Sequence, residues 1–315
     1  MLEIENLNVS YSVRTNSFFG KEKLRAVEDV SFKVGLSETI GLVGESGCGK
    51  STLGRAILKL ISVESGSVKF YDTDLLKLNR KEMRPFRKKI QVVFQDPYSS
   101  LNPRMTIGEI VTEGLFSHEN ISRKEGLEKA VAILKKVNLD STILKRYPHE
   151  FSGGQRQRIA IARALIVNPE FIICDEAVSA LDVSTQAQVI NLLIDLKEER
   201  KYSYLFISHD LNIIRHISDK IAVMYLGKIV EFGSKKQISE SPKHPYTKAL
   251  FSSVFDIFDR KKKREILKGE IPSILNKPTG CHFHTRCPIA KEICKTTPPE
   301  WKVFSNEHKT TCHFV

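Results

Sequence analysis

The chain has 315 residues, of which 41% are hydrophobic and 27% are charged. These fractions are close to the average of globular proteins, which excludes a disordered chain and one embedded in a membrane. No apolar run approaches the roughly 18 residues of a spanning helix, and residues 1–9 mix acidic with apolar side chains, unlike a signal peptide. We therefore expect the protein to stay in the cytosol. The net charge of +12 would suit nucleotide phosphates, nucleic acid or an anionic membrane surface.

The pattern along the chain predicts an α/β fold with a mostly parallel sheet. Runs of branched apolar residues predict buried strands at 39–43, 90–94, 171–174 and 204–207. Apolar residues at helical spacing in 127–134 and 189–196 predict amphipathic helices that cover the sheet. The polar segment 12–25 is expected to be a loop between two early strands.

The first motif along the chain is a phosphate-binding pattern, G-x-x-x-x-G-K-[ST], directly after the strand at 39–43. Its glycines let backbone N–H groups face phosphates, and the following helix start adds positive potential. The lysine reaches the β and γ phosphates, and the serine hydroxyl can bind Mg²⁺. We expect ATP to bind through Gly44, Glu45, Ser46, Gly47, Cys48, Gly49, Lys50, Ser51 and Thr52.

The domain organisation is predicted from changes in this pattern. Residues of about 97–165 have helical patterns and turn residues but little strand signal, which predicts a helical subdomain inserted between two core strands. After about residue 260, proline, cysteine and histidine become frequent, which predicts a small appended domain. We therefore divide the chain into a nucleotide-binding domain at 1–260 and a C-terminal extension at 261–315.

The strand at 171–174 ends in two carboxylates, Asp175 and Glu176. Acids at this distance after a phosphate loop suit a metal ion beside the phosphates and a base beside the attacking water. We expect Asp175 to hold the metal and Glu176 to act as the general base.

Phe151, Ser152, Gly153, Gly154 and Gln155, followed by Arg-Gln-Arg, resemble the signature of ABC ATPases. Serine and glycines that head a helix offer backbone donors and a helix dipole to a phosphate. The resemblance implies that this phosphate belongs to ATP bound on a partner subunit.

Further positions resemble the same family one by one. The resemblance implies Gln95 as the glutamine loop, Asp182 at the dimer interface and His209 as the switch histidine. It implies Ser51, Gln95 and Asp175 as Mg²⁺ ligands. Tyr11 resembles the aromatic residue that stacks on adenine, with Phe18 and Phe19 close to it in sequence.

Residues 95–104, residues 244–247 and the C-terminal cysteines resemble importers of oligopeptides, dipeptides or nickel, most of all their second, F-type ATPase subunit. The resemblance implies a second homologous ATPase subunit, two membrane permease subunits and an extracytoplasmic substrate-binding protein as partners. It places the chain at the cytoplasmic face of the membrane. The cargo, peptide or nickel, stays open. A soluble ABC ATPase acting on nucleic acid or ribosomes is the rival, but a single cassette without heptads argues against it, so no nucleic acid is expected.

Cys48 and Cys174 are expected to be unpaired thiols, whereas four cysteines crowd the C-terminus: Cys281, Cys287, Cys294 and Cys312. A reducing cytosol favours metal over disulfides. The long gaps between them, and the similar cysteine-bearing tail of the peptide importers, favour a [4Fe-4S] cluster over zinc. Zinc with His282, His284 or His313 and unligated thiols remain the alternatives.

Overall fold

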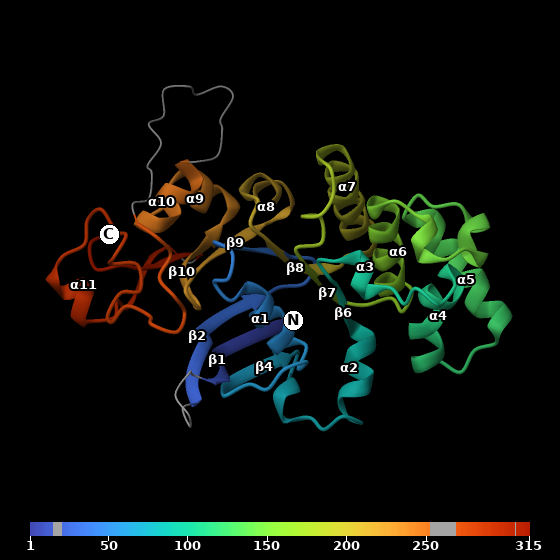
Figure 1. Ribbon diagram of the computed structural model, residues 1–315, viewed down its shortest axis with the longest axis horizontal. Coiled ribbons are helices and arrows are strands. Elements are labelled where there is room, and N and C mark those ends of the chain that lie inside the picture. The colour runs from blue at the N-terminus through green and yellow to red at the C-terminus, as the bar shows by residue number, and fades with distance from the viewer. Residues whose placement is uncertain (15–20, 253–268, 306) are drawn as a thin grey trace. The chain divides into compact units, whose positions relative to one another are not determined.

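The computed structural model describes residues 1–14, 21–252, 269–305 and 307–315, and its elements are drawn in Figure 1. The residues cluster into two compact units. The first unit holds residues 1–33, 40–76 and 208–315, and the second holds 34–39 and 77–207. Within the described parts of the chain, no helix is long and apolar enough to cross a membrane.

The first unit contains an antiparallel sheet with the strand order β2-β1-β4-β5. Its strands are β1 (Leu2–Arg14), β2 (Lys21–Val34), β4 (Ser65–Phe70) and β5 (Thr73–Asp74). The predicted loop at 12–25 is therefore wrong at both ends, since β1 continues to Arg14 and β2 begins at Lys21. An antiparallel strand with one face in water carries many polar residues, and this polarity resembles that of a loop.

A second sheet in this unit begins at the strand before the phosphate loop. β3 (Thr39–Val43) runs parallel to β9 (Lys220–Tyr225), which pairs antiparallel with β10 (Lys228–Ser234). The C-terminal strands β12 (His308–Thr311) and β11 (Trp301–Ser305) continue the sheet beyond β10. The predicted domain boundary at residue 260 lies outside the described residues, and the domain limits stay a prediction.

The helices of the first unit are short. They are α1 (Lys50–Ile57), η1 (Leu75–Lys77), α8 (Leu211–Ile217), α9 (Lys235–Glu240), α10 (Pro245–Ser252) and α11 (Glu292–Thr296). α1 buries Leu53, Ala56 and Ile57, so its start at the phosphate loop is fixed by packing of the helix that follows.

The second unit is built on three parallel strands in the order β8-β7-β6. They are β6 (Ile90–Val93), β7 (Phe171–Asp175) and β8 (Ser203–Ser208), within one residue of their predicted ends. Every residue of β7 and β8 is buried. α7 (Val183–Arg200) buries its predicted apolar face, and the Tyr204 hydroxyl of β8 donates to the Leu193 carbonyl of α7 at 3.2 Å. α7 therefore covers the sheet, as the periodicity predicted.

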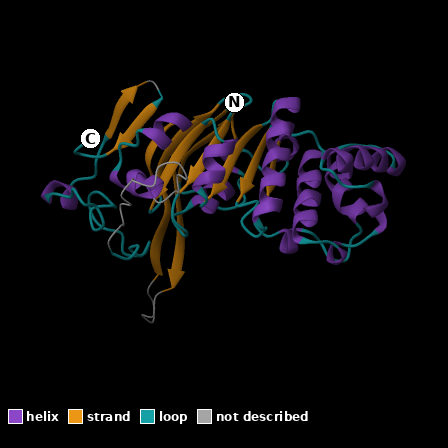
Figure 2. Cartoon of the chain, turned by 90° about the horizontal axis from the view of Figure 1, so that it is seen from above, coloured by secondary structure: helices purple, strands orange, loops and turns teal. Residues whose placement is uncertain are grey.

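The remaining elements of this unit are helical, and Figure 2 shows them as a group of helices without strands among them. They are α2 (Met83–Lys89), α3 (Pro97–Ser100), α4 (Ile107–His118), α5 (Arg123–Lys136), η2 (Ser141–Lys145), η3 (Pro148–Glu150) and α6 (Gly153–Leu165). α5 was expected to cover the sheet, but it packs on α4 and α6 and leaves Leu127 and Val131 exposed. Periodicity shows that a helix has an apolar face but not which element that face meets.

Candidate functional site

The phosphate loop joins β3 to α1 in the first unit. Gly47 and Gly49 have φ angles of 77° and 111°, in the left-handed region that glycine adopts without strain. A Cβ atom on Gly44 would lie 2.1 Å from the Met224 carbonyl oxygen, and one on Gly49 would lie 2.3 Å from that of Ala26. Only glycines let this loop lie so close to β2 and β9. The resulting turn at a helix N-terminus is the form in which backbone N–H groups bind phosphate.

Lys50 is the basic residue of the loop, and only 4% of it is exposed. Its ammonium donates to the carbonyls of Gly44 at 2.8 Å and Glu45 at 3.0 Å. The cation is thus held inside the loop, where phosphate oxygens can take over its hydrogen bonds. Burial raises the pKa of the nearby Cys48 thiol to about 11, so this thiol is neutral at pH 7 and adds no negative charge beside a nucleotide.

The other predicted residues of the first unit lie at element ends or on exposed faces. Ser51 and Thr52 are in the first turn of α1, and Tyr11 is on β1, where 37% of it is exposed. His209 follows β8 directly and is exposed, while the next residue, Asp210, caps α8. Their predicted roles in nucleotide binding stay predictions.

The second unit brings two predicted residues together at the carboxyl ends of β6 and β7. The Gln95 amide donates to the Glu176 carboxylate at 2.9 Å. Glu176 has a φ of 48°, which is strained for a residue with a side chain, and its N–H donates to the Ile207 carbonyl at 3.0 Å. Asp175, just before it, is buried. A carboxylate fixed by its backbone and oriented by an amide is arranged as a general base should be.

The signature segment heads α6 in the same unit. The Ser152 hydroxyl accepts from the Gln155 N–H at 3.3 Å, and the Gln155 side chain accepts from the Ser152 N–H at 3.1 Å, which is a capping box. Phe151 is buried beneath the Arg146 guanidinium. A Cβ atom on Gly154 would lie 2.3 Å from the Thr185 methyl carbon, so this glycine lets the start of α6 approach α7 closely.

Asp182, predicted at a dimer interface, is the N-cap of α7. Its carboxylate accepts hydrogen bonds from the Ser184 hydroxyl and from the hydroxyl and N–H of Thr185. These bonds, that from Ser184 first, hold the pKa of the Asp182 carboxyl well below its usual range. Within the chain Asp182 therefore orients α7, and its interface role stays a prediction.

Sequence reasoning missed a connection between the segment after Gln95 and the signature helix. The Arg156 guanidinium lies 3.8 Å from the centre of the Tyr98 ring, and its Nε donates to the Pro148 carbonyl at 2.7 Å. Arg163 of the same helix donates to the Ser100 carbonyl. Arg156 and Tyr98 both lie in the motifs, but only the fold shows that α3 rests on α6 through this stacked pair.

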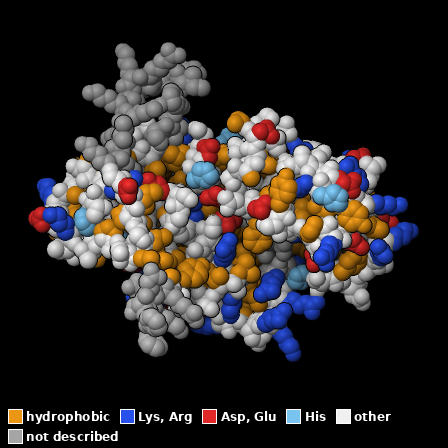
Figure 3. All heavy atoms as spheres, in the orientation of Figure 1, with side chains coloured by type: hydrophobic (Ala, Val, Ile, Leu, Met, Phe, Trp, Pro, Cys, Tyr) orange, Lys and Arg blue, Asp and Glu red, His pale blue; other side chains and the backbone are white. Residues whose placement is uncertain are grey.

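The basic residues around α2 form a face of Lys and Arg side chains in Figure 3. Several lysines of the second unit are paired with acids of the same unit: Lys88 with Glu119, Lys89 with Glu170 and, on α5, Lys136 with Glu199. These pairs neutralise charge locally, which lowers the potential available to a nucleic-acid backbone.

The C-terminal cysteines are free thiols, and Cys294 and Cys312 are buried. Burial, with the other three thiols nearby, raises the pKa of Cys281 to about 11. However, in the part of the chain that the structure describes, no three His, Cys, Asp or Glu side chains form a group that could hold a metal ion. Nor do the histidines of the zinc alternative join such a group. The predicted metal site is therefore not formed by these side chains as they are placed.

A glycine-rich loop between a buried parallel strand and a helix defines a P-loop nucleotide-binding protein. Comparison with known proteins narrows this class. The family described as "ABC transporter" matches residues 27–179, and the family "Oligopeptide/dipeptide transporter, C-terminal region" matches residues 230–294.

Two curated relatives match nearly the whole chain. The oligopeptide transport ATP-binding protein AppF of Bacillus subtilis is 50% identical over 99% of this chain and 97% of its own length. The oligopeptide transport ATP-binding protein OppF of Haemophilus influenzae is 49% identical over 99% of this chain and 96% of its own. A solved dimeric structure of the ATP-binding cassette MJ0796, bound to ADP and Pi, is 30% identical with a TM-score of 0.67. It covers 75% of this chain and 99% of its own. The chain belongs to the ABC transporter family, as an ABC ATPase of the group that carries the oligopeptide/dipeptide C-terminal region.

Proposed function

We propose that this chain is the ATP-binding and ATP-hydrolysing subunit that energises an ABC importer of oligopeptides or dipeptides. The phosphate loop carries the first half of the proposal, because its left-handed glycines and buried Lys50 form a phosphate cradle before α1. The second half is supported by relatives named as oligopeptide transport ATP-binding proteins, which match along the full length.

In the proposed reaction Lys50 and the loop N–H groups hold the phosphates, and His209 contacts the γ-phosphate. Ser51, Gln95 and Asp175 would hold Mg²⁺, which would neutralise charge on the phosphates. Their donors suit this hard cation: a hydroxyl, a carboxylate and an amide oxygen. Because the Gln95 nitrogen donates to Glu176, its oxygen stays available to a cation. Glu176 then takes the proton of the attacking water.

We also propose that the chain works as half of a dimer, with its signature segment serving ATP on a second, nonidentical ATPase subunit. The dimeric state of the related cassette MJ0796 supports this arrangement. Two permease subunits and an extracytoplasmic binding protein would complete the complex, with this chain peripheral at the cytoplasmic face of the membrane. Closing of the ATP-bound dimer would turn the permease, since ATP binds the closed state more tightly.

The function is tested with the complete transporter in proteoliposomes, by following MgATP hydrolysis and uptake together. Peptide-loaded binding protein should stimulate both, and Glu176→Gln in this chain should abolish the stimulation. Glu198→Gln, an exposed carboxylate on α7, is the matched control and should retain it. Stimulation by nickel-loaded binding protein instead would favour the nickel importer. Stimulation of the free subunit by RNA or ribosomes, without coupling to uptake, would contradict the proposal.

A finer proposal is that Cys281, Cys287, Cys294 and Cys312 bind a [4Fe-4S] cluster. Its support is the composition of this segment, with four cysteines and no disulfide among its described residues, and the Cys281 N–H, which donates to the Cys294 carbonyl at 2.8 Å and so joins two of the four. Anaerobically purified protein should then contain iron and acid-labile sulfide in equal amounts, and Cys287→Ser should bleach it while sparing ATP binding. Stoichiometric zinc in colourless protein would replace the cluster with the zinc alternative, and metal-free protein would leave unligated thiols.

A further inference from the structure

A side chain of the C-terminal region reaches the phosphate loop. The Arg286 guanidinium forms two parallel hydrogen bonds with the Glu45 carboxylate, at 2.7 and 3.0 Å. The pair is shielded from water, with 6% of the Arg286 side chain and 20% of the Glu45 side chain exposed. These hydrogen bonds raise the pKa of the Arg286 guanidinium above its usual range. A bidentate, largely buried pair of this kind is among the stronger polar contacts in proteins.

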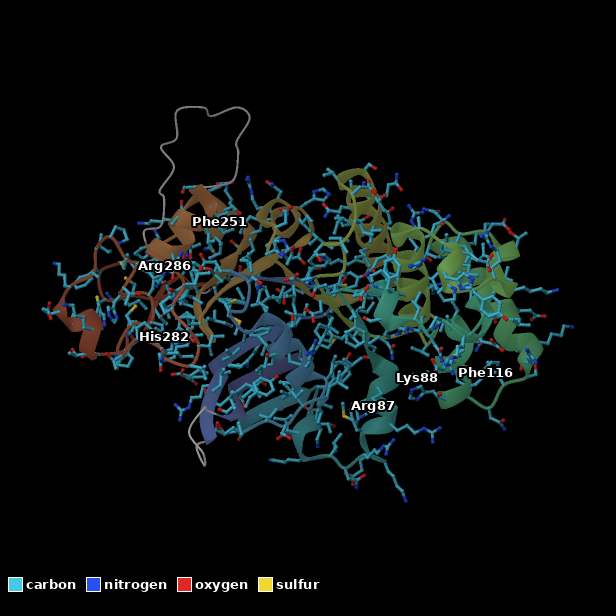
Figure 4. The ribbon with its side chains drawn as sticks, in the orientation of Figure 1. Arg87, Lys88, Phe116, Phe251, His282 and Arg286 are labelled. Atoms are coloured by element: carbon cyan, nitrogen blue, oxygen red, sulfur yellow. The ribbon has the colours of Figure 1, made fainter. Side chains whose placement is uncertain are left out.

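Glu45 is held at its backbone as well. Its N–H donates to the Tyr246 hydroxyl at 3.0 Å, and Tyr246 is fully buried. The Tyr246 ring packs against Phe283, with ring centres 5.4 Å apart, and the Arg286 N–H donates to the Phe283 carbonyl at 3.0 Å. Arg286 and Tyr246 therefore act on Glu45 from one packed cluster. Figure 4 labels Arg286 on the C-terminal segment, together with His282.

A second contact of the same region lies near the other end of the loop. Lys277 pairs with Glu28 at 3.2 Å. The Glu28 N–H donates to the Gly227 carbonyl at 2.9 Å, and the Gly227 N–H donates to the Cys48 carbonyl at 2.8 Å. The C-terminal region thus contacts the loop directly at Glu45 and through Gly227 at Cys48.

The Arg286–Glu45 pair affects nucleotide binding through its charge. Glu45 puts a carboxylate into a loop whose ligand is a triphosphate, and like charges within about 10 Å repel appreciably when water is partly excluded. We infer that Arg286 is a positioning residue of the phosphate loop, which neutralises Glu45 and holds it away from the nucleotide. The C-terminal region therefore completes the ATP site, and ATP binding and the folding of that region stabilise each other.

The inference is tested in four variants by measuring the MgATP affinity of the full chain and the turnover of the assembled transporter. Arg286→Ala should weaken MgATP binding by roughly tenfold, as one uncompensated charge near the phosphates would, and should raise KM more than it lowers kcat. Arg286→Lys keeps the charge without the bidentate geometry, so its MgATP affinity should lie between that of Arg286→Ala and that of the parent. Glu45→Gln removes the carboxylate and is the reference for the double variant Glu45→Gln/Arg286→Ala. If Arg286 acts by neutralising Glu45, the double variant should bind MgATP as tightly as Glu45→Gln does.

The double variant separates neutralisation of Glu45 from simple structural support. Rising salt concentration should reduce the difference in MgATP affinity between Arg286→Ala and the parent, since salt screens charge repulsion. Lys295→Ala, which breaks an exposed ion pair with Glu292 in the same region, is the matched control and should change neither affinity nor turnover. Parent-like affinity in Arg286→Ala would overturn the inference. So would a double variant whose MgATP affinity falls as far below that of Glu45→Gln as the affinity of Arg286→Ala falls below that of the parent. If Arg286→Ala fails to fold, the double variant decides: folded protein with the MgATP affinity of Glu45→Gln supports the inference, and unfolded protein or protein that binds more weakly than Glu45→Gln rejects it.

Discussion

The phosphate loop and the signature segment are both glycine-rich starts of a helix, but they are built differently. The phosphate loop has two glycines with positive φ, and the N-cap of α1, Gly49, has no side-chain hydrogen bond. The start of α1 therefore lacks a side-chain cap, although the Glu45 N–H donates to the Tyr246 hydroxyl and the Cys48 N–H donates to the Glu45 carbonyl. The signature segment starts α6 with a capping box, in which Ser152 and Gln155 satisfy each other. The two helix starts thus differ in their caps: α1 follows a glycine without a side chain, whereas the first donors of α6 are occupied by Ser152 and Gln155.

Supports outside each loop differ as well. The phosphate loop is held by residues far away in sequence, Arg286 and Tyr246. The signature helix rests on neighbours in its own subdomain, such as Tyr98 under Arg156. The contrast is consistent with the proposed roles, in which the phosphate loop binds this chain's nucleotide and the signature segment serves the nucleotide of a partner subunit.

The largest expected effect concerns a residue in neither loop. If both loops bind phosphate and Glu176 alone accepts the proton, Glu176→Gln should keep MgATP affinity while turnover falls by about 10² to 10⁴, as for loss of a general base. Steady-state hydrolysis by the assembled transporter and equilibrium nucleotide binding measure the two quantities. Turnover equal to that of the parent would remove Glu176 from the role of base.

The next effect concerns Lys50, the lysine that distinguishes the phosphate loop from the signature segment. Lys50→Ala removes the cation held inside the phosphate loop, and a charge-assisted hydrogen bond contributes enough that MgATP binding should weaken roughly ten- to a hundredfold. Lys33→Ala, which removes a lysine from an exposed pair with Glu3, is the control and should bind as the parent does. Unchanged affinity in Lys50→Ala would show that the phosphates bind elsewhere.

A smaller effect concerns the stability at low pH of the buried residues, His244 and Tyr246, that support the phosphate loop. Burial lowers the pKa of His244 to about 3, and its ring accepts from the N–H of Tyr246 at 3.1 Å. The neutral ring contributes stability above the unfolded pKa near 6.5, and this contribution is lost as the pH falls toward 3. By pH 5 the loss is about 2 kcal/mol. Between pH 7.5 and pH 5, the free energy of unfolding of His244→Asn, measured by urea unfolding, should therefore fall by about 2 kcal/mol less than that of the parent. If His244→Asn kept the parent's dependence of stability on pH, the buried imidazole would not be the group that titrates.

The sequence predicted the core of the fold because its strands carry an unambiguous signal. β7 and β8 are buried along their whole length, so they consist of continuous apolar runs with ends at polar residues. The antiparallel strands β1 and β2, in which buried and less buried residues largely alternate, lack that signal. The apolar face of the helix α5 does not tell which element it packs against. Contacts between distant segments are set by packing, which periodicity does not contain.

The same distinction applies to the site. The phosphate loop and the acids after β7 were found because their chemistry requires fixed spacing of residue types. The pairing of Gln95 with Glu176 follows from adjacent parallel strands and could be anticipated. Arg286 could not be found in this way, since no spacing relates it to Glu45, 241 positions away. The metal site predicted from four cysteines shows the converse, because closeness in sequence did not gather the ligands.

The central claim is that the two helix starts serve different nucleotides, and affinity for MgATP tests it most directly. The isolated chain, Ser152→Ala and Lys50→Ala are titrated side by side with MgATP. The account predicts that Ser152→Ala binds within about twofold of the parent, although it impairs hydrolysis in the assembled dimer, while Lys50→Ala binds weakly. If Ser152→Ala weakened this chain's own MgATP binding as much as Lys50→Ala does, the signature would serve the same nucleotide and the account would be contradicted.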